Sequence, residues 1–89
     1  MKCFSHTITD PDGFHVRLVG AFVKEAKKYP CAVTVEKNEH RVNAKNMFHV
    51  MELGIMKGET INIIVDGVKE EEAIAALEEC LKAHDRVEL

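Results

Sequence analysis

A histidine stands where a turn signal runs into a helical pattern, in the segment Asp10-Pro11-Asp12-Gly13-Phe14-His15-Val16-Arg17. The first backbone N–H groups of a helix have no partner within the helix, and the helix dipole is positive there, so this position favours a phosphate group. A neutral imidazole is a nucleophile near neutral pH, and an arginine side chain forms charge-assisted hydrogen bonds with phosphate oxygens. His15 and Arg17 therefore predict a site that accepts and holds a phosphoryl group. The alternative is that His15 is an exposed residue at a helix start with no chemical role.

The composition is that of one small soluble domain, which we expect to span residues 1–89. Of the 89 residues, 46% are apolar, which suffices for one core. The net charge of −3 argues against general affinity for nucleic acid. The three cysteines form no C-x-x-C motif, the N-terminus lacks an apolar signal region, and no apolar run reaches transmembrane length. We therefore expect a cytoplasmic protein, without membrane insertion, that meets protein or small-molecule partners.

The elements around His15 follow from the spacing of the apolar residues. Apolar residues at alternate positions predict strands, and apolar residues three or four apart predict helices. Strands are expected over residues 2–9, 31–37, 40–43 and 59–65, and helices over residues 16–28, over residues 46–53 and from Glu70 onward. The order β-α-β-β-α-β-α favours an α+β fold, with three helices on one face of a four-stranded antiparallel sheet. The other face should meet water and carry Ser5, Thr7, Thr34 and Asn62.

Short connections separate these elements. Asn38-Glu39 predicts a two-residue hairpin turn, although the glycine that favours such turns is missing. Gly54 is expected to end the second helix, since glycine readily adopts the left-handed conformation found after helices. Acidic residues 70–72 suit the first turn of the last helix because the helix dipole is positive there.

Three blocks of the chain carry a resemblance to a known family. They are Gly13-Phe14-His15-Val16-Arg17, then Phe22-Val23-Lys24-Glu25-Ala26-Lys27, and Ala44-Lys45-Asn46-Met47-Phe48 continuing to Leu53-Gly54. Over essentially the whole chain they resemble HPr, the histidine-containing phosphocarrier family of the bacterial phosphoenolpyruvate-dependent sugar phosphotransferase system. The resemblance implies that Enzyme I phosphorylates His15 on Nδ1, with Arg17 beside the phosphate, and that the group passes to IIA domains of sugar permeases. It also implies an open-faced HPr-like sandwich and a stoichiometric carrier, rather than an enzyme, that needs no cofactor.

Three positions depart from the family pattern. Leu18 replaces a proline, which gives the first helical turn an additional backbone N–H and removes a fixed φ angle. Asp12 stands where many members have a neutral residue, and its carboxylate is expected to repel phosphate and slow the transfer. Asn46 replaces the serine that a dedicated kinase phosphorylates in Gram-positive members. Asparagine has no hydroxyl, so this control should be absent, although its amide can cap the short helix.

An apolar surface is expected next to the site. Its predicted members are Val16, Gly20, Met47, Phe48 and Met51, with Lys24, Lys27, Lys28 and Lys45 around it. A basic rim suits an acidic partner groove such as Enzyme I presents in the family, and methionines suit a surface that meets several partners. The alternative is that the lysines only solvate a helix and that Met47 and Met51 fill the core. We expect the protein to bind its partners as a monomer.

Two other functions stay open at this point. A regulatory protein of HPr fold, in a nitrogen-related branch or acting through bound partners, would carry phosphate weakly or incidentally. A small ligand-binding α/β domain rests on architecture alone. The other histidines, His6, His40, His49 and His84, show no spacing that pairs them with one another or with a cysteine, so no metal site is expected.

Overall fold

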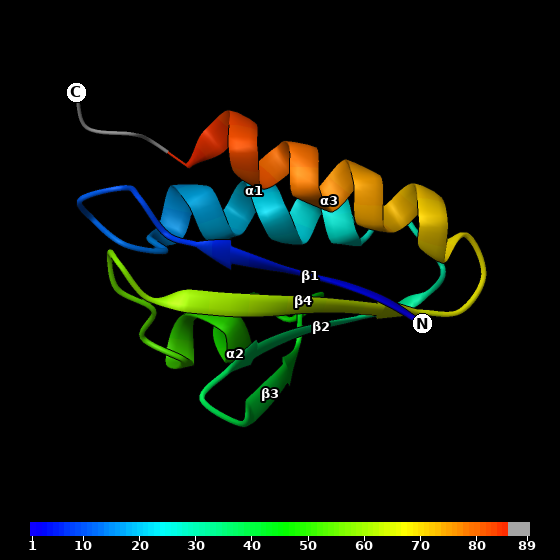
Figure 1. Cartoon of the computed structure of the whole chain (residues 1–89), viewed down its shortest axis with the longest axis horizontal. Helices are drawn as coiled ribbons and strands as arrows, with labels where there is room; N and C mark the ends of the chain where they lie inside the picture. Colours follow the sequence, from blue (N-terminus) through cyan, green and yellow to red (C-terminus); the bar gives the residue numbers. More distant parts are fainter. Residues whose placement is uncertain (86–89) are drawn as a thin grey trace.

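The computed structural model describes residues 1–85 of the chain. The elements follow in the predicted order: β1 (Lys2–Thr7), α1 (Val16–Ala26), β2 (Ala32–Lys37), β3 (His40–Asn43), α2 (Met47–Glu52), β4 (Thr60–Asp66) and α3 (Glu70–His84) (Figure 1). Their boundaries differ from the predicted ones by at most two residues. The helix α1, for example, ends at Ala26 because the N–H groups of Lys28 and Tyr29 bond to carbonyls only three residues back, which tightens the last turn.

The strands form one antiparallel sheet in the order β1-β4-β2-β3. Alternate residues of the inner strands are fully buried, namely Val33 and Val35 in β2 and Ile61, Ile63 and Val65 in β4. The helices cover this apolar face, and α1 and α3 run side by side in opposite directions (Figure 1). The predicted α+β fold, with helices on one face of an antiparallel sheet, is confirmed.

The other face of the sheet carries a polar row that crosses every strand. Ser5, Asn62, Glu36 and Arg41 are neighbours in the strand register. Ser5 Oγ donates to Asn62 Oδ1 at 2.5 Å, Asn62 Nδ2 donates to Glu36 Oε1 at 3.0 Å, and Arg41 Nε donates to Glu36 Oε2 at 2.6 Å. The hydrogen bond from Arg41 holds the pKa of Glu36 below its usual value. The prediction of a polar outer face is confirmed.

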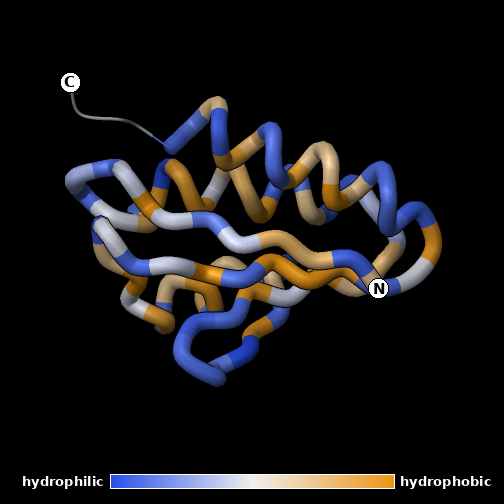
Figure 2. Tube along the Cα trace, viewed as in Figure 1, coloured by the Kyte–Doolittle hydropathy of each residue, from blue (hydrophilic) through white to orange (hydrophobic). Residues whose placement is uncertain are grey.

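The β2–β3 hairpin turns at Asn38 and Glu39, whose φ angles are 48° and 70°. Positive φ at both central residues is the geometry of a two-residue turn whose twist matches that of antiparallel strands. Asparagine enters this region more readily than most residues, so the hairpin forms without a glycine. Figure 2 shows the turn as one of the most hydrophilic segments of the chain. The predicted stop at Gly54 is also confirmed, since its φ angle is 58° directly after α2.

One core fills the space between the sheet and the helices, and its largest fully buried side chains include Leu18, Phe22, Ile61 and Leu77. Phe14 joins this core, and its ring meets that of Phe22 edge-on at a centroid distance of 5.9 Å. At one end of the molecule, residues 8–15, residues 53–59 and the end of α3 lie together (Figure 1). Within residues 1–85, no helix is both long enough and apolar enough to cross a membrane.

Candidate functional site

The loop before α1 is fixed to the rest of the molecule at Gly13 and Phe14. Gly13 N–H donates to the carbonyl of Asp10 at 2.9 Å, and Phe14 N–H donates to the carbonyl of Ile55 at 3.0 Å. Gly13 has a φ angle of +71°, and a Cβ atom built there would lie 2.7 Å from the Ile55 carbonyl oxygen. Only glycine fits this approach without strain. The side chain of Phe14 is buried, so the loop is held by both backbone and core contacts.

His15 is the N-cap residue of α1, with extended backbone angles of φ −80° and ψ 173°. The first hydrogen bond of the helix runs from Val19 N–H to the His15 carbonyl at 2.8 Å. The N–H groups of Val16, Arg17 and Leu18 therefore have no carbonyl one turn earlier in the helix to bond. The predicted position of His15 at a helix start is confirmed. Its side chain is 18% exposed, which leaves the ring within reach of a partner.

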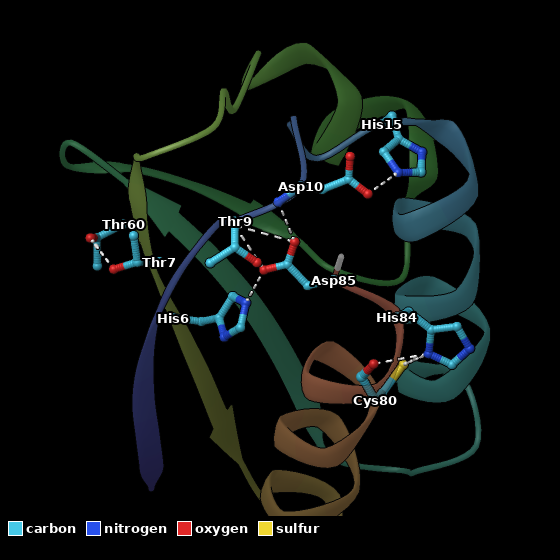
Figure 3. A network of polar contacts seen from close by, with 9 residues as sticks. All are labelled: His6, Thr7, Thr9, Asp10, His15, Thr60, Cys80, His84 and Asp85. Atoms are coloured by element: carbon cyan, nitrogen blue, oxygen red, sulfur yellow. Dashed lines mark hydrogen bonds and ion pairs between the residues drawn. The ribbon is translucent and has the colours of Figure 1, made fainter. Parts of the chain in front are cut away.

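A buried carboxylate lies against the imidazole of His15. Asp10 Oδ2 is 3.0 Å from His15 Nε2, and the Asp10 side chain is only 2% exposed (Figure 3). The other oxygen of Asp10 accepts the backbone N–H of Asp12 at 2.9 Å. The sequence pointed to Asp12, whose side chain is exposed, and Asp10 was missed. The available signal was an aspartate at the first position of a turn, where its side chain often accepts the N–H two residues later.

A second buried carboxylate, that of Asp85, connects the end of α3 to the same loop. Asp85 Oδ2 lies 2.7 Å from His6 Nε2 and accepts the N–H of Thr9 at 3.0 Å, and Asp85 Oδ1 accepts the N–H of Asp10 at 2.9 Å (Figure 3). The Asp85 side chain is 2% exposed. These bonds draw the chain toward α3 after Thr7, so β1 ends two residues before its predicted end. Sequence patterns gave no sign of this contact because Asp10 and Asp85 are 75 residues apart.

Arg17 follows His15 on the first turn of α1, and its side chain is exposed. It lines a surface pocket of ≈ 200 Å³ together with Leu18, Ala83 and His84. Val16, the residue between His15 and Arg17, is 60% exposed. The first turn of α1 thus carries an exposed cation and an exposed apolar side chain, and Arg17 lies on the side of the turn that meets the end of α3.

The residues of the predicted apolar surface lie on α1 and α2, which approach each other at Gly20 and Met47. A Cβ atom built on Gly20 would lie 3.9 Å from the terminal methyl of Met47, so the two helices approach closely there. Phe48 is 81% exposed and Met51 is 40% exposed, whereas Met47 is partly buried against the core. The core-filling alternative therefore holds in part for Met47, and Met51 lies on the surface. We call Val16, Gly20, Met47, Phe48 and Met51 the helix surface.

The chain matches a known protein family over most of its length. The family model for the PTS HPr component phosphorylation site matches residues 3–83. This chain belongs to the HPr family. It is 40% identical over 70 residues to the phosphocarrier protein HPr of Buchnera aphidicola, a match that covers 79% of this chain and 82% of that protein.

Further HPr proteins support the assignment over nearly the whole chain. The phosphocarrier protein HPr of Mycoplasma genitalium is 37% identical over 83 residues, covering 92% of this chain and 94% of that protein. A solved histidine-containing phosphocarrier protein of Mycoplasma has a TM-score of 0.92 at 32% identity, covering 99% of this chain and 100% of that chain. The molecule is therefore a phosphocarrier protein with the HPr fold.

The lysines expected around the apolar surface gather near the end of α1 in this HPr chain. Lys45 Nζ donates to the carbonyl of Tyr29 at 2.6 Å, just beyond the last turn of α1, so the length of that helix, about 16 Å, separates it from His15. Lys24 lies in the last turn of α1, Lys27 is its C-cap residue, and both are exposed. Lys28 is paired with Glu25. The charge of these lysines thus lies at the end of α1 that is far from His15.

Two further departures of this HPr chain can be located. Asn46 is the N-cap residue of α2, and its Oδ1 accepts the N–H of His49 at 3.2 Å, so the expected capping role is confirmed. The side chain of Leu18 is fully buried in the core. Leu18 can therefore contribute to the site at the start of α1 only through its backbone N–H.

The expectation that no histidine is spaced to pair with a cysteine was wrong for His84, which lies one helical turn after Cys80 on α3. Their Sγ and Nδ1 atoms lie 3.8 Å apart, and His84 Nδ1 is 2.9 Å from the Cys80 carbonyl oxygen. The spacing of four residues on a helix was the signal that could have found this contact.

Proposed function

We propose that this HPr-family protein carries phosphoryl groups in a phosphoenolpyruvate-dependent sugar phosphotransferase system. Enzyme I phosphorylates His15 on Nδ1, and the phosphohistidine passes the group to IIA domains of sugar permeases. The observation that supports this proposal best is the placement of a partly exposed imidazole at the N-cap of α1, next to three N–H groups without intrahelical partners. The protein is a stoichiometric carrier in this reaction and uses no cofactor.

The transfer step is a displacement at phosphorus. The lone pair of His15 Nδ1 forms the new N–P bond while the bond between phosphorus and the phosphorylated group of Enzyme I breaks. In the second transfer, the N–P bond of His15 breaks and the imidazole leaves with its electron pair. No proton needs to enter or leave through Nδ1 in either direction.

The helix start supports the phosphate without trapping it. The N–H groups and dipole of a helix N-terminus stabilise an exposed negative charge by about 0.3–1 kcal/mol. Arg17, which is exposed on the same turn, adds a charge-assisted contact to the phosphate oxygens. A modest stabilisation of this size orients the group and still permits the onward transfer. The additional N–H of Leu18 strengthens the cradle, whereas the exposed Asp12 carboxylate slows the approach of phosphate.

The helix surface is the docking site that we propose for both partners. It includes the exposed side chains of Val16, which follows His15 in the chain, and of Phe48 and Met51 on α2. Lys24 and Lys27 extend it with positive charge at the far end of α1. A partner with an apolar centre and an acidic margin would bind here and place its own reacting group over His15.

Phosphorus NMR tests the proposal directly. The protein is incubated with phosphoenolpyruvate and a catalytic amount of Enzyme I, and the wild type should give one phosphohistidine signal of the Nδ1 type. His15→Ala is the control and should give none. A signal that persists in His15→Ala, or the absence of any signal in the folded wild type, would contradict the proposal.

Addition of a IIA domain separates the carrier from the regulatory protein of HPr fold. Once the phosphoenolpyruvate has been removed, a carrier transfers its phosphoryl group to an excess of IIA, and the phosphohistidine signal of His15 disappears. A regulatory protein would accept phosphate slowly and retain it. Retention of the label in the presence of several IIA domains would favour the second function.

Control through residue 46 is absent in this proposal because Asn46 carries an amide in place of a hydroxyl. Incubation with the serine kinase that modifies HPr proteins and with labelled ATP should leave the wild type unlabelled. Asn46→Ser should become labelled, because serine restores the hydroxyl and keeps a side chain that can cap α2. Label at residue 46 of the wild type would overturn this part of the proposal.

A further inference from the structure

The contact between Asp10 and His15 bears on which ring nitrogen can react. Asp10 Oδ2 lies 3.0 Å from His15 Nε2, and Figure 3 shows the two side chains pointing toward one another. An ionised carboxylate only accepts hydrogen bonds. With Asp10 ionised, the Nε2 atom carries the hydrogen in this contact. A neutral imidazole has one N–H, so the lone pair is then on Nδ1.

We infer that Asp10 is a positioning residue for phosphoryl transfer: it selects the tautomer of His15 in which Nδ1 is the nucleophile and fixes the direction in which Nδ1 points. This inference rests on the proposed function of His15 and extends it to a residue outside the helix. The Asp12 carboxylate does not have this role, because Asp12 meets Asp10 through its backbone N–H.

Asp10 is itself held from several sides, as a positioning residue must be. Its Oδ1 atom accepts the N–H of Asp12 at 2.9 Å, and its backbone N–H donates to Asp85 Oδ1 at 2.9 Å. Its carbonyl accepts the N–H of Gly13 at 2.9 Å. The side chain is only 2% exposed, and it cannot turn into solvent without breaking its contacts with the Asp12 N–H and with His15. Rotation of the His15 ring away from the Nε2···Oδ2 contact would leave this buried carboxylate without one of its donors.

The same contact matters after the N–P bond has formed. Attack through Nδ1 leaves the hydrogen on Nε2, so the phosphorylated ring carries a positive charge. The hydrogen bond from Nε2 to the ionised Asp10 carboxylate then has a charged donor as well as a charged acceptor, which strengthens it. During the onward transfer the N–P bond breaks, the ring becomes neutral, and the hydrogen stays on Nε2. Asp10 therefore stabilises the charged ring without taking its proton.

The test is a measurement of the His15 tautomer by 15N NMR in the unphosphorylated protein, at a pH where the ring is neutral. In the wild type, the resonances should identify Nε2 as the protonated nitrogen and Nδ1 as the unprotonated one. A hydrogen on Nδ1 in the wild type would overturn the inference by itself, so the test does not depend on a variant. It also does not depend on phosphorylation, and so it can fail or succeed separately from the proposed function.

Asp10→Asn should reverse the tautomer. The Asp12 N–H requires an acceptor, so the amide oxygen of residue 10 takes the place of Oδ1 and the NH₂ group faces His15 Nε2. A donor at this place favours a lone pair on Nε2 and the hydrogen on Nδ1. Phosphorylation by Enzyme I should then slow by at least about tenfold, because the nucleophilic nitrogen is blocked. An unchanged tautomer in folded Asp10→Asn, judged from its amide spectrum, would contradict the inference.

Asp12→Asn is the matched control for the tautomer. It removes a carboxylate of the same loop but keeps the backbone N–H that Asp10 accepts. The hydrogen should stay on Nε2 in this variant. A reversal in Asp12→Asn as large as that in Asp10→Asn would show that loop charge in general, rather than the Asp10 contact, sets the tautomer.

Discussion

At the scale of single residues, the site depends on Gly13 as much as on His15. The φ angle of +71° and the distance of 2.7 Å between an added Cβ atom and the Ile55 carbonyl oxygen leave no room for a side chain. This glycine directs Phe14 into the core and His15 onto the helix start. The sequence predicted a turn at Gly13, but the contact with Ile55 depends on a loop more than 40 residues later, which no local pattern describes.

Gly13→Ala should therefore destabilise the protein. A left-handed backbone costs a residue with a Cβ atom about 1–2 kcal/mol, and the clash with the Ile55 carbonyl adds to this cost. Urea unfolding followed by circular dichroism measures the free energy of unfolding. Gly20→Ala is the matched control, because its Cβ would meet only Met47 at 3.9 Å within a helix. We expect it to be neutral or stabilising by about 0.5–1 kcal/mol. Equal losses in both variants would contradict the account of Gly13.

The same scale shows why His15 was predictable and Asp10 was not. The motif around His15 lies within eight consecutive residues, and its helix start follows from local spacing. Burial of the Asp10 carboxylate depends on bonds from its own loop and on Asp85, which lies at the other end of the described chain. Local spacing therefore favoured the carboxylate nearest to the glycine, that of Asp12, instead of the one that contacts the ring.

At the scale of elements, the order of strands and helices was predictable because each has a clear period of apolar residues. Their ends were less predictable, since bonds to distant residues decide them. β1 stops at Thr7, where the chain turns toward Asp85, and α1 stops where short-range bonds tighten its last turn. The close approach of α1 and α2 could not be predicted from the sequence either, because it depends on how the two helices pack on the sheet.

At Phe48, on the helix surface, we expect a substitution to weaken the binding of a partner without changing the stability of the fold. Its ring is 81% exposed on the short helix α2, so its removal should change the free energy of unfolding little. Truncation of a central aromatic residue at an interface costs about 2 kcal/mol or more, which corresponds to a tenfold or greater rise in Kd. Titration calorimetry of Phe48→Ala with Enzyme I measures this change. Val68→Ala removes another exposed apolar side chain, next to the start of α3, and should leave the affinity unchanged. Unaltered binding by Phe48→Ala would place the interface elsewhere.

The loop of residues 53–59, which bonds to the Phe14 N–H, contains a carboxylate that makes the stability of the fold depend on pH. Glu59 Oε1 accepts the N–H of Met56 at 2.7 Å and lies 3.0 Å from Lys37 Nζ. The Met56 hydrogen bond, with a smaller contribution from Lys37, lowers the pKa of Glu59 below its usual value of 4.5. A lowered pKa in the folded state means that the ionised group stabilises the fold above the pKa of the unfolded chain. This contribution is lost as the pH falls through the lower folded pKa.

Glu59→Gln should therefore be less stable than the wild type near neutral pH and approach it in acid. Thermal unfolding of both proteins between pH 7 and pH 3 gives the difference in Tm at each pH. The difference should be constant above the ordinary glutamate range and shrink below it. A difference that stays the same down to pH 3 would show that the carboxylate charge of Glu59 does not contribute.

At the scale of the whole molecule, the reactivity of the three cysteines with a thiol reagent measures how well the core excludes solvent. Cys3 is exposed on the outer face of the sheet, whereas Cys31 and Cys80 are buried. Burial raises the pKa of the Cys80 thiol, which lowers its reactive thiolate fraction. A thiol reagent should modify one cysteine quickly in the native protein and the other two only on unfolding. Mass spectrometry identifies the sites. Rapid modification of Cys80 in the native protein would contradict the close packing of α3.

The bonds from Thr9 and Asp10 to Asp85 also have a consequence for biosynthesis. The loop that presents His15 is translated early, but the carboxylate that anchors it lies 75 residues after Asp10. A chain still being made on the ribosome thus contains the histidine and lacks the anchor that holds its loop. Assembly of the site is delayed until almost all of the fold has been synthesised, and the loop before α1 gains this anchor only at the end of α3.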